Sequence, residues 1–196
     1  MTTSTWTLQK VVATVAILNL AYFGIEFSVA LAIGSVALFA DSVDFLEDAA
    51  VNILILIGLG WSVRARAKLG MVLAAIILVP AIATLWTAWN NFAGGHVPDA
   101  VPLTLAGMGA LAVNLTCALM LARFREHSGS LTRAAFLSAR NDVLANVAII
   151  AAGLVTAVTF SPWPDLIVGL AIAAMNIDAA REVFEAAQSE HAEAKP

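Results

Sequence analysis

Charged residues are scarce in this chain. Only 12% of its 196 residues are Asp, Glu, Lys or Arg, whereas 61% are hydrophobic. A typical soluble domain is about one quarter charged and about half apolar. A soluble globule of this length has too little interior to bury so many apolar side chains. The composition therefore excludes a soluble enzyme, and it equally excludes a disordered chain.

Cysteine and runs of basic residues are also lacking. The single cysteine, Cys117, cannot form a disulfide within the chain, and a metal site built from several cysteines is excluded. The formal net charge is −4, and no block of Lys and Arg suggests a nucleic-acid partner. The class that fits these absences is an integral membrane protein.

Long apolar runs account for most of the chain. A helix needs about 20 mainly apolar residues to cross a bilayer. Six stretches of that kind are present, at residues 10–33, 38–61, 69–90, 101–122, 134–159 and 165–186. We therefore expect an all-α protein with six transmembrane helices. Residues 1–187 are expected to form one membrane domain, and residues 188–196 a short polar tail.

Basic residues predict how these helices are oriented. The connections after the second and fourth stretches carry Lys and Arg, whereas the three opposite connections carry none. Connections rich in Lys and Arg stay in the cytoplasm. Both chain termini are therefore expected to be cytoplasmic.

Four acidic residues lie in the second stretch, although a carboxylate in the hydrocarbon core costs several kcal/mol. Asp41, Asp44 and Asp48 fall within about 60° of one another on a helix, and Glu47 lies beside this stripe. Close carboxylates repel unless a proton or a cation lies between them. The pattern favours a divalent cation at Asp44 and Asp48. For Asp41, near the end of the stretch, a solvated interfacial position is the alternative.

A second polar stripe lies on the fifth stretch. Ser138, Asp142 and Asn146 are spaced four residues apart and share one helix face, while Asn141 is turned about 100° away. Asp142 is ionisable and is predicted to be functional. For Ser138 and Asn146, metal ligation and hydrogen bonding between helices are both open.

Glu26 is the acidic residue of the first stretch. It is either a relay for protons or metal, or a polar contact with a neighbouring helix, and the sequence leaves both interpretations open. The three histidines, at positions 96, 127 and 191, lie outside the apolar stretches. We expect them to be solvated and not to bind the metal.

Residues 34–48, GSVALFADSVDFLED, resemble the start of the second helix in the cation diffusion facilitator family. Members of that family are six-span exporters of divalent metals, mostly zinc, which they exchange for protons. In the family an Asp recurs at the place of Asp41. A His or Asp followed four residues later by Asp occupies the places of Asp44 and Asp48. Asp142 matches the last Asp of a second such pair on the fifth helix.

This resemblance covers residues 10–187 and implies a secondary active transporter, not an enzyme. It implies proton-coupled efflux of Zn²⁺, or of Cd²⁺, Mn²⁺ or Fe²⁺, by alternating access, with a metal site at Asp44, Asp48 and Asp142. It also implies that the metal is cargo with no separate cofactor. A homodimer held by transmembrane helices is expected, with the bilayer, metal ions and protons as its other partners, in the bacterial inner membrane.

Two departures from the family pattern bear on these expectations. Ser138 stands where the family has a His, so Asp41, Glu47, Asn141 and Asn146 become candidates to complete or support the metal shell. A shell of oxygen atoms alone favours Mn²⁺ or Mg²⁺ over Zn²⁺. Family members also usually carry a cytoplasmic metal-binding domain after the sixth helix. This chain is expected to be a short form without that domain.

Two further classes of function stay open. The spacing of Asp41, Asp44 and Asp48 is similar to the magnesium–diphosphate motif of membrane prenyltransferases. However, Ala40 replaces the usual Asn, and a second Asp-rich motif is absent. The other class is a metal-binding membrane subunit that does not transport, which the serine at position 138 would suit. Such a subunit would bind the ion without moving it.

Overall fold

The computed structural model describes residues 7–58, 63–124 and 130–193. This part of the chain forms six α-helices and has no strand. The helices are α1 (Leu8–Ile33), α2 (Val36–Gly58), α3 (Val63–Gly94), α4 (Ala100–Ala122), α5 (Ser130–Thr159) and α6 (Trp163–Glu193). Each one overlaps one of the six predicted stretches, so the prediction of an all-α fold is confirmed.

Two helices are longer than the apolar stretches that predicted them. Helix α3 begins at Val63, within a basic segment, and α6 continues to Glu193, into the predicted polar tail. Lys, Arg, Glu and Ala are good helix formers, so a helix continues past its apolar part until a helix-breaking residue or the chain end stops it. The division into a domain at 1–187 and a tail at 188–196 stays a prediction.

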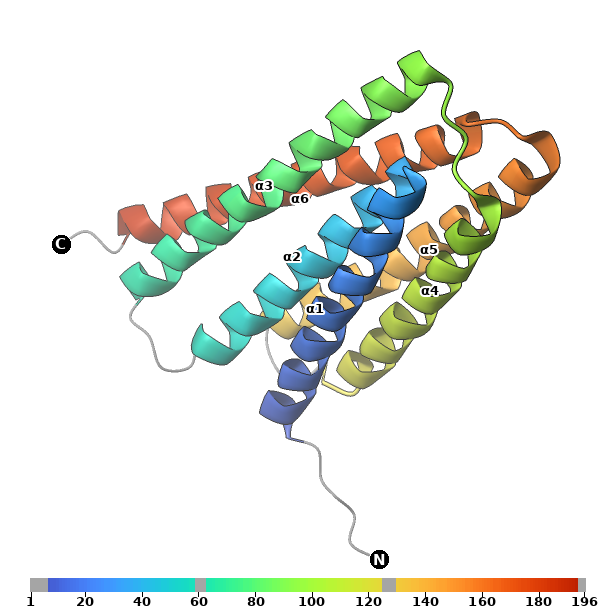
Figure 1. Cartoon of the computed structure of the whole chain (residues 1–196). Coiled ribbons are helices and arrows are strands. Elements are labelled where there is room, and N and C mark those ends of the chain that lie inside the picture. Colours follow the sequence, from blue (N-terminus) through green and yellow to red (C-terminus); the bar gives the residue numbers. More distant parts are fainter. Residues whose placement is uncertain (1–6, 59–62, 125–129, 194–196) are drawn as a thin grey trace, which may run out of the picture.

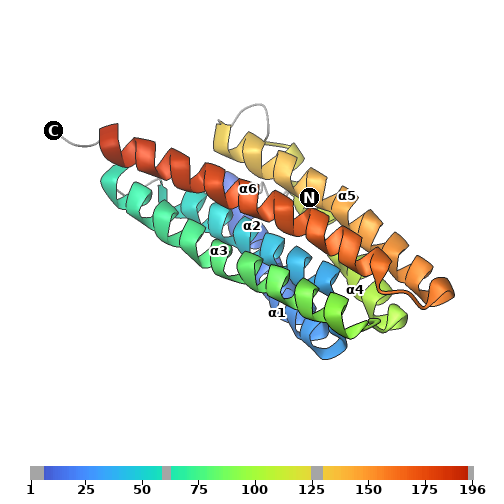
Figure 2. The same ribbon diagram turned by 90° about the horizontal axis from the view of Figure 1, so that it is seen from above.

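The helices run alternately up and down one bundle (Figure 1). The connections α1–α2, α3–α4 and α5–α6 lie at one end, and α1 begins at the other end, where α6 also finishes. Figure 2 shows α6 lying between α3 and α5, and α6 contacts both of them. Helix α2 contacts each of the other five helices, so the acidic stretch lies at the centre of the bundle.

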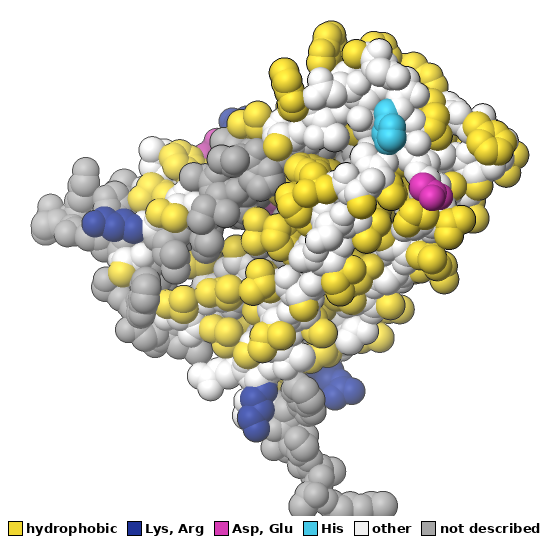
Figure 3. All heavy atoms as spheres, viewed as in Figure 1, with side chains coloured by type: hydrophobic (Ala, Val, Ile, Leu, Met, Phe, Trp, Pro, Cys, Tyr) yellow, Lys and Arg dark blue, Asp and Glu magenta, His cyan; other side chains and the backbone are white. Residues whose placement is uncertain are grey.

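The outer surface of the bundle is apolar. Hydrophobic side chains are spread over the face formed by α1 and α4 in Figure 3, and Ile17 and Leu119 are among the exposed ones. Within the described residues, three segments are long and apolar enough to cross a bilayer by themselves: Leu8–Ile33, Ala100–Ala122 and Ala139–Thr159. Helix α2 carries four acidic residues, and its contacts with the other five helices shield it from the bilayer. The chain is an integral membrane protein.

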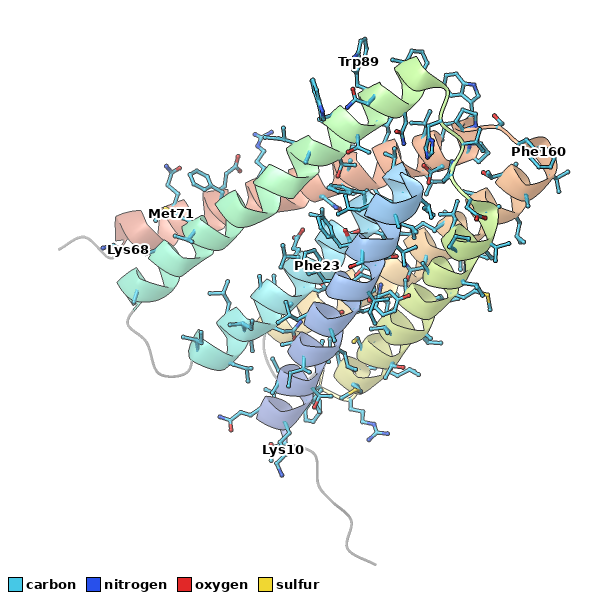
Figure 4. All side chains as sticks on the ribbon, viewed as in Figure 1. Lys10, Phe23, Lys68, Met71, Trp89 and Phe160 are labelled. Atoms are coloured by element: carbon cyan, nitrogen blue, oxygen red, sulfur yellow. The ribbon has the colours of Figure 1, made fainter. Side chains whose placement is uncertain are left out.

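Charged and aromatic side chains mark the two ends of the bundle. Lys10 and Lys68 lie towards the end where α1 begins, and Trp89 and Phe160 lie towards the opposite end (Figure 4). This separation agrees with the positive-inside pattern of the sequence. The cytoplasmic placement of both termini stays a prediction.

Asp165 joins the start of α6 to the start of α2. Its carboxylate accepts hydrogen bonds from Ser35 Oγ at 2.6 Å, Val36 N at 2.8 Å and Ala37 N at 3.2 Å. Gly34 precedes this cap with φ of 64°, and His96 Nε2 lies 2.8 Å from the carbonyl oxygen of Ile33. The turn therefore needs glycine, because the left-handed conformation disfavours other residues. These contacts fix where α2 begins, and so where its acids lie.

Candidate cation site

A pocket of about 130 Å³ lies between α2, α5 and α6. Its lining is mainly acidic and polar: Asp44, Glu47, Asp48, Asn141, Asp142, Met175 and Asn176. Since one water molecule takes about 30 Å³ in the liquid, this volume accommodates an ion together with a few waters. The three aspartates predicted as ligands therefore line a single pocket.

Helix geometry brings these three aspartates together. Asp44 and Asp48 are one turn apart on α2, and α2 packs against α5, which carries Asp142. Asp48 is 6% exposed and Asp142 is 8% exposed, and their carboxyl groups are close enough to form a hydrogen bond. Such a bond requires a proton on one of the two groups, because ionised carboxylates only accept. The pocket thus concentrates acid in the interior of a membrane bundle.

Negative charge dominates around Asp44. The described residues whose charges interact with the Asp44 carboxyl group are all acidic: Asp41, Glu47, Asp48 and Asp142. Arg140 is exposed and donates from its guanidinium to Asn141 Oδ1 at 3.4 Å. A cluster of buried acids is stabilised by protons or by a cation that lies between them.

The acids line the pocket without closing on one point. Within the part of the chain that the structure describes, no group of three or more His, Cys, Asp or Glu side chains is arranged to hold a metal ion. Binding an ion through three carboxylates would require α2 and α5 to approach or their side chains to turn inward.

The supporting residues predicted from the sequence fall in three places. Glu47 and Asn141 line the pocket, whereas Asp41 and Asn146 do not. Asn146 Nδ2 instead donates to Asp41 Oδ2 at 2.7 Å, and both side chains are fully buried. Ser138 belongs to α5, but its side chain lies outside the described residues. Glu26, on α1, is fully buried and faces Asp41.

Asn176 is a pocket residue that the sequence analysis missed. It lines the pocket from α6, is 2% exposed, and its Nδ2 donates to the carbonyl oxygen of Ala40 at 2.9 Å. The sequence did contain a signal for it, because Asn176 is an amide within the apolar stretch 165–186. Polar side chains inside a membrane usually form hydrogen bonds with neighbouring helices. Asn176 therefore adds a polar side chain from a third helix to the lining of the pocket.

Comparison with known protein families finds a match over most of the chain. A model of the cation efflux transmembrane domain matches residues 12–190, which is most of the chain and includes every residue that lines the pocket. No curated protein matches the chain.

Proposed function

Because the chain belongs to the cation efflux family, we propose that it transports a divalent cation bound by Asp44, Asp48 and Asp142. The observation that carries this proposal is the pocket, where the three aspartates line one cavity inside the bundle. Family membership makes the chain a membrane transporter of metal cations. The identity of the ion, its exchange for protons and the residues that bind it belong to the proposal.

Carboxylate chemistry supports a divalent ion as the cargo. Two or three carboxylates offset the charge of the ion after it has left bulk water, and Glu47 and Asn141 offer further oxygens in the same pocket. Oxygen ligands suit Mn²⁺ and Mg²⁺, and carboxylates also bind Zn²⁺. We propose Zn²⁺ as the first cargo, with Cd²⁺, Mn²⁺ and Fe²⁺ as competitors.

Exchange for protons follows from the same carboxylates. A carboxylate oxygen that carries a proton cannot ligate a metal, so binding of the metal releases protons. A proton shared by Asp48 and Asp142, which both line the pocket, would take the place of the cation between these carboxyl groups. An inward proton gradient would then drive the cation outward, as groups of helices rock around a fixed site.

The surroundings of the transporter are also part of the proposal. We place the protein in the bacterial inner membrane with Lys10 and Lys68 on the cytoplasmic side. A homodimer would form through the exposed apolar faces of the helices. The prenyltransferase alternative is disfavoured because Asp41 faces α1 and α5, so the three aspartates of its motif do not line one pocket.

The proposal is tested by uptake into proteoliposomes that carry a pH gradient and a metal-sensitive dye. Wild-type protein should accumulate Zn²⁺ faster than empty vesicles, and dissipating the gradient should abolish this accumulation. Asp142→Asn should reduce the rate of uptake at least about tenfold. Mutation of a residue that merely supports a metal ligand already costs about 10- to 100-fold in metal affinity or activity. Asp99→Asn, an exposed acid-to-amide change outside the pocket, serves as the matched control.

The competing functions give different results in this assay. Full transport by Asp142→Asn would remove the assignment of the site. Binding of Zn²⁺ without uptake by the wild-type protein would identify a metal-binding subunit instead of a transporter. Parallel measurements with Cd²⁺, Mn²⁺, Fe²⁺ and Mg²⁺ would rank the cargo.

A further inference from the structure

Glu26 on α1 and Asp41 on α2 form a second acidic group, which we call the acid pair. Both side chains are 0% exposed, and neither lines the pocket. Asp41 lies three residues, about one helical turn, before Asp44. The acid pair is therefore close to the cation pocket but separate from it.

Hydrogen bonds hold Asp41 in a defined orientation. Asn114 Nδ2 donates to Asn146 Oδ1 at 3.1 Å, and Asn146 Nδ2 donates to Asp41 Oδ2 at 2.7 Å. The bond from Asn114 fixes which side of the Asn146 amide faces Asp41, because the amide oxygen must point towards the donor. Helices α4 and α5 thus leave only Oδ1 of Asp41 free to face α1.

The remaining oxygens of the acid pair lack a donor. Oδ1 of Asp41 and both carboxyl oxygens of Glu26 are buried and accept no hydrogen bond from the N–H and O–H groups of the described residues. The two carboxyl groups nevertheless face each other across the packed α1–α2 contact and interact electrostatically, and a proton between them would supply the missing hydrogen bond. A hydrogen bond between two carboxyl groups exists only when one of them carries a proton.

Among the residues that the structure describes, the charged groups that interact with the acid pair are acidic. Asp44 interacts electrostatically with Glu26. Asp48, one turn beyond Asp44 on α2, and Asp142 on α5 interact electrostatically with Asp41. Tyr22 on α1 is also nearby, but its hydroxyl donates to the carbonyl oxygen of Ala106 on α4. Two ionised carboxylates at such a site would repel each other with little screening.

We propose that the acid pair binds one proton between Glu26 and Asp41, and that this proton opposes cation binding in the neighbouring pocket. The first part of this inference stands on the buried oxygens, and the second part rests on the proposed function. The two positive charges would lie about one helical turn apart in a medium of low dielectric constant, so each weakens binding of the other. This coupling is reciprocal, because a cation that enters the pocket must weaken proton binding to the pair by the same factor.

Glu26→Gln tests the inference without removing the hydrogen bond. Glutamine keeps the length of the side chain and offers an N–H donor to Asp41, but it cannot release a proton. Zn²⁺ affinity is measured on purified protein over a range of pH, where the slope of log K against pH counts the protons released per ion. The variant should release fewer protons by up to about one, and it should bind Zn²⁺ about tenfold more weakly at alkaline pH.

A matched control and a second variant accompany this measurement. Asp99→Asn makes the same chemical change at an exposed helix cap and should leave the proton count unchanged. If Glu26→Gln does not fold, Asp41→Asn takes its place. This variant leaves Glu26 without a facing carboxylate, so it should give the same lowered proton count. An unchanged proton count in whichever variant folds would overturn the inference.

Infrared spectroscopy separates failure of the acid pair from failure of the proposed function. A carbonyl stretching band of a protonated carboxyl group that is present in the wild type and lost in Glu26→Gln would support the pair, even if no cation binds. If the spectra of the wild type and of Glu26→Gln show no difference in such a band, the acid pair is refuted, whatever the transport assay shows. Absence of Zn²⁺ binding with the band present would refute only the coupling and the proposed function.

Discussion

Replacing Asp165 with Ala should destabilise the protein more than replacing any exposed helix cap. The carboxylate accepts hydrogen bonds from three donors, on Ser35, Val36 and Ala37, and all three residues are 0% exposed. A buried donor left without an acceptor costs about 1–3 kcal/mol. Removing the buried carboxylate also removes the cost of its own desolvation. We therefore expect a net loss of about 3–4 kcal/mol.

Thermal unfolding in detergent measures this loss, and the five tryptophans of the chain provide the fluorescence signal. A loss of about 3–4 kcal/mol corresponds to a fall in Tm of about 10 °C for a chain of this length. Asp165→Asn keeps one acceptor oxygen and should fall between Asp165→Ala and the wild type. Asp99→Ala is the control, because Asp99 is an exposed cap with one bond, to Val101 N at 3.1 Å, and its loss costs about 1 kcal/mol. Equal Tm values for Asp165→Ala and Asp99→Ala would refute the reasoning.

Three further predictions concern the α1–α2 turn, the interior of α1 and the pocket. Gly34→Ala should destabilise the protein by about 1–3 kcal/mol, since the backbone is left-handed and an added Cβ would lie 2.6 Å from His96 Nε2. Gly24→Ala, where an added Cβ meets nothing within 4 Å, should be neutral or stabilising by about 0.5–1 kcal/mol in the same unfolding assay. Asn176→Ala should weaken Zn²⁺ binding about tenfold in a direct titration, because the Asn176 side chain lines the pocket and is hydrogen-bonded to Ala40. An unchanged Zn²⁺ affinity would place Asn176 outside the site.

The sequence predicts the helices well because their signal is local. Apolar runs of the required length identify all six helices, and the differences lie at helix ends, for example where polar helix formers extend α3 and α6. It also predicts that Asp44, Asp48 and Asp142 are candidates for one site, because ionisable groups stand out in apolar stretches. That they line one pocket is a property of the structure, and that they bind metal stays a prediction.

Contacts between helices are what the sequence could not provide. Periodicity assigns Asp41 to the same face as Asp44 and Asp48, within about 60°. In the bundle that small angle is enough to turn Asp41 towards α1 and α5 while the other two line the pocket. The same limit applies to Asn176, whose role depends on α6 lying against α2. Which faces meet is decided by packing along the whole bundle.

The hydrogen bonds from Asp165 fix the first turn of α2, so any tilting of this helix would pivot about that end. With a rise of about 1.5 Å per residue, Asp44 lies roughly 12 Å from Val36 along the axis, and Gly58 lies roughly 33 Å from it. If α2 pivots at its capped end, Asp44 moves about one third as far as Gly58, and Asp48, roughly 18 Å from Val36, moves about half as far. Tilting of α2 about this end would therefore displace Gly58 about two to three times as far as the carboxylates.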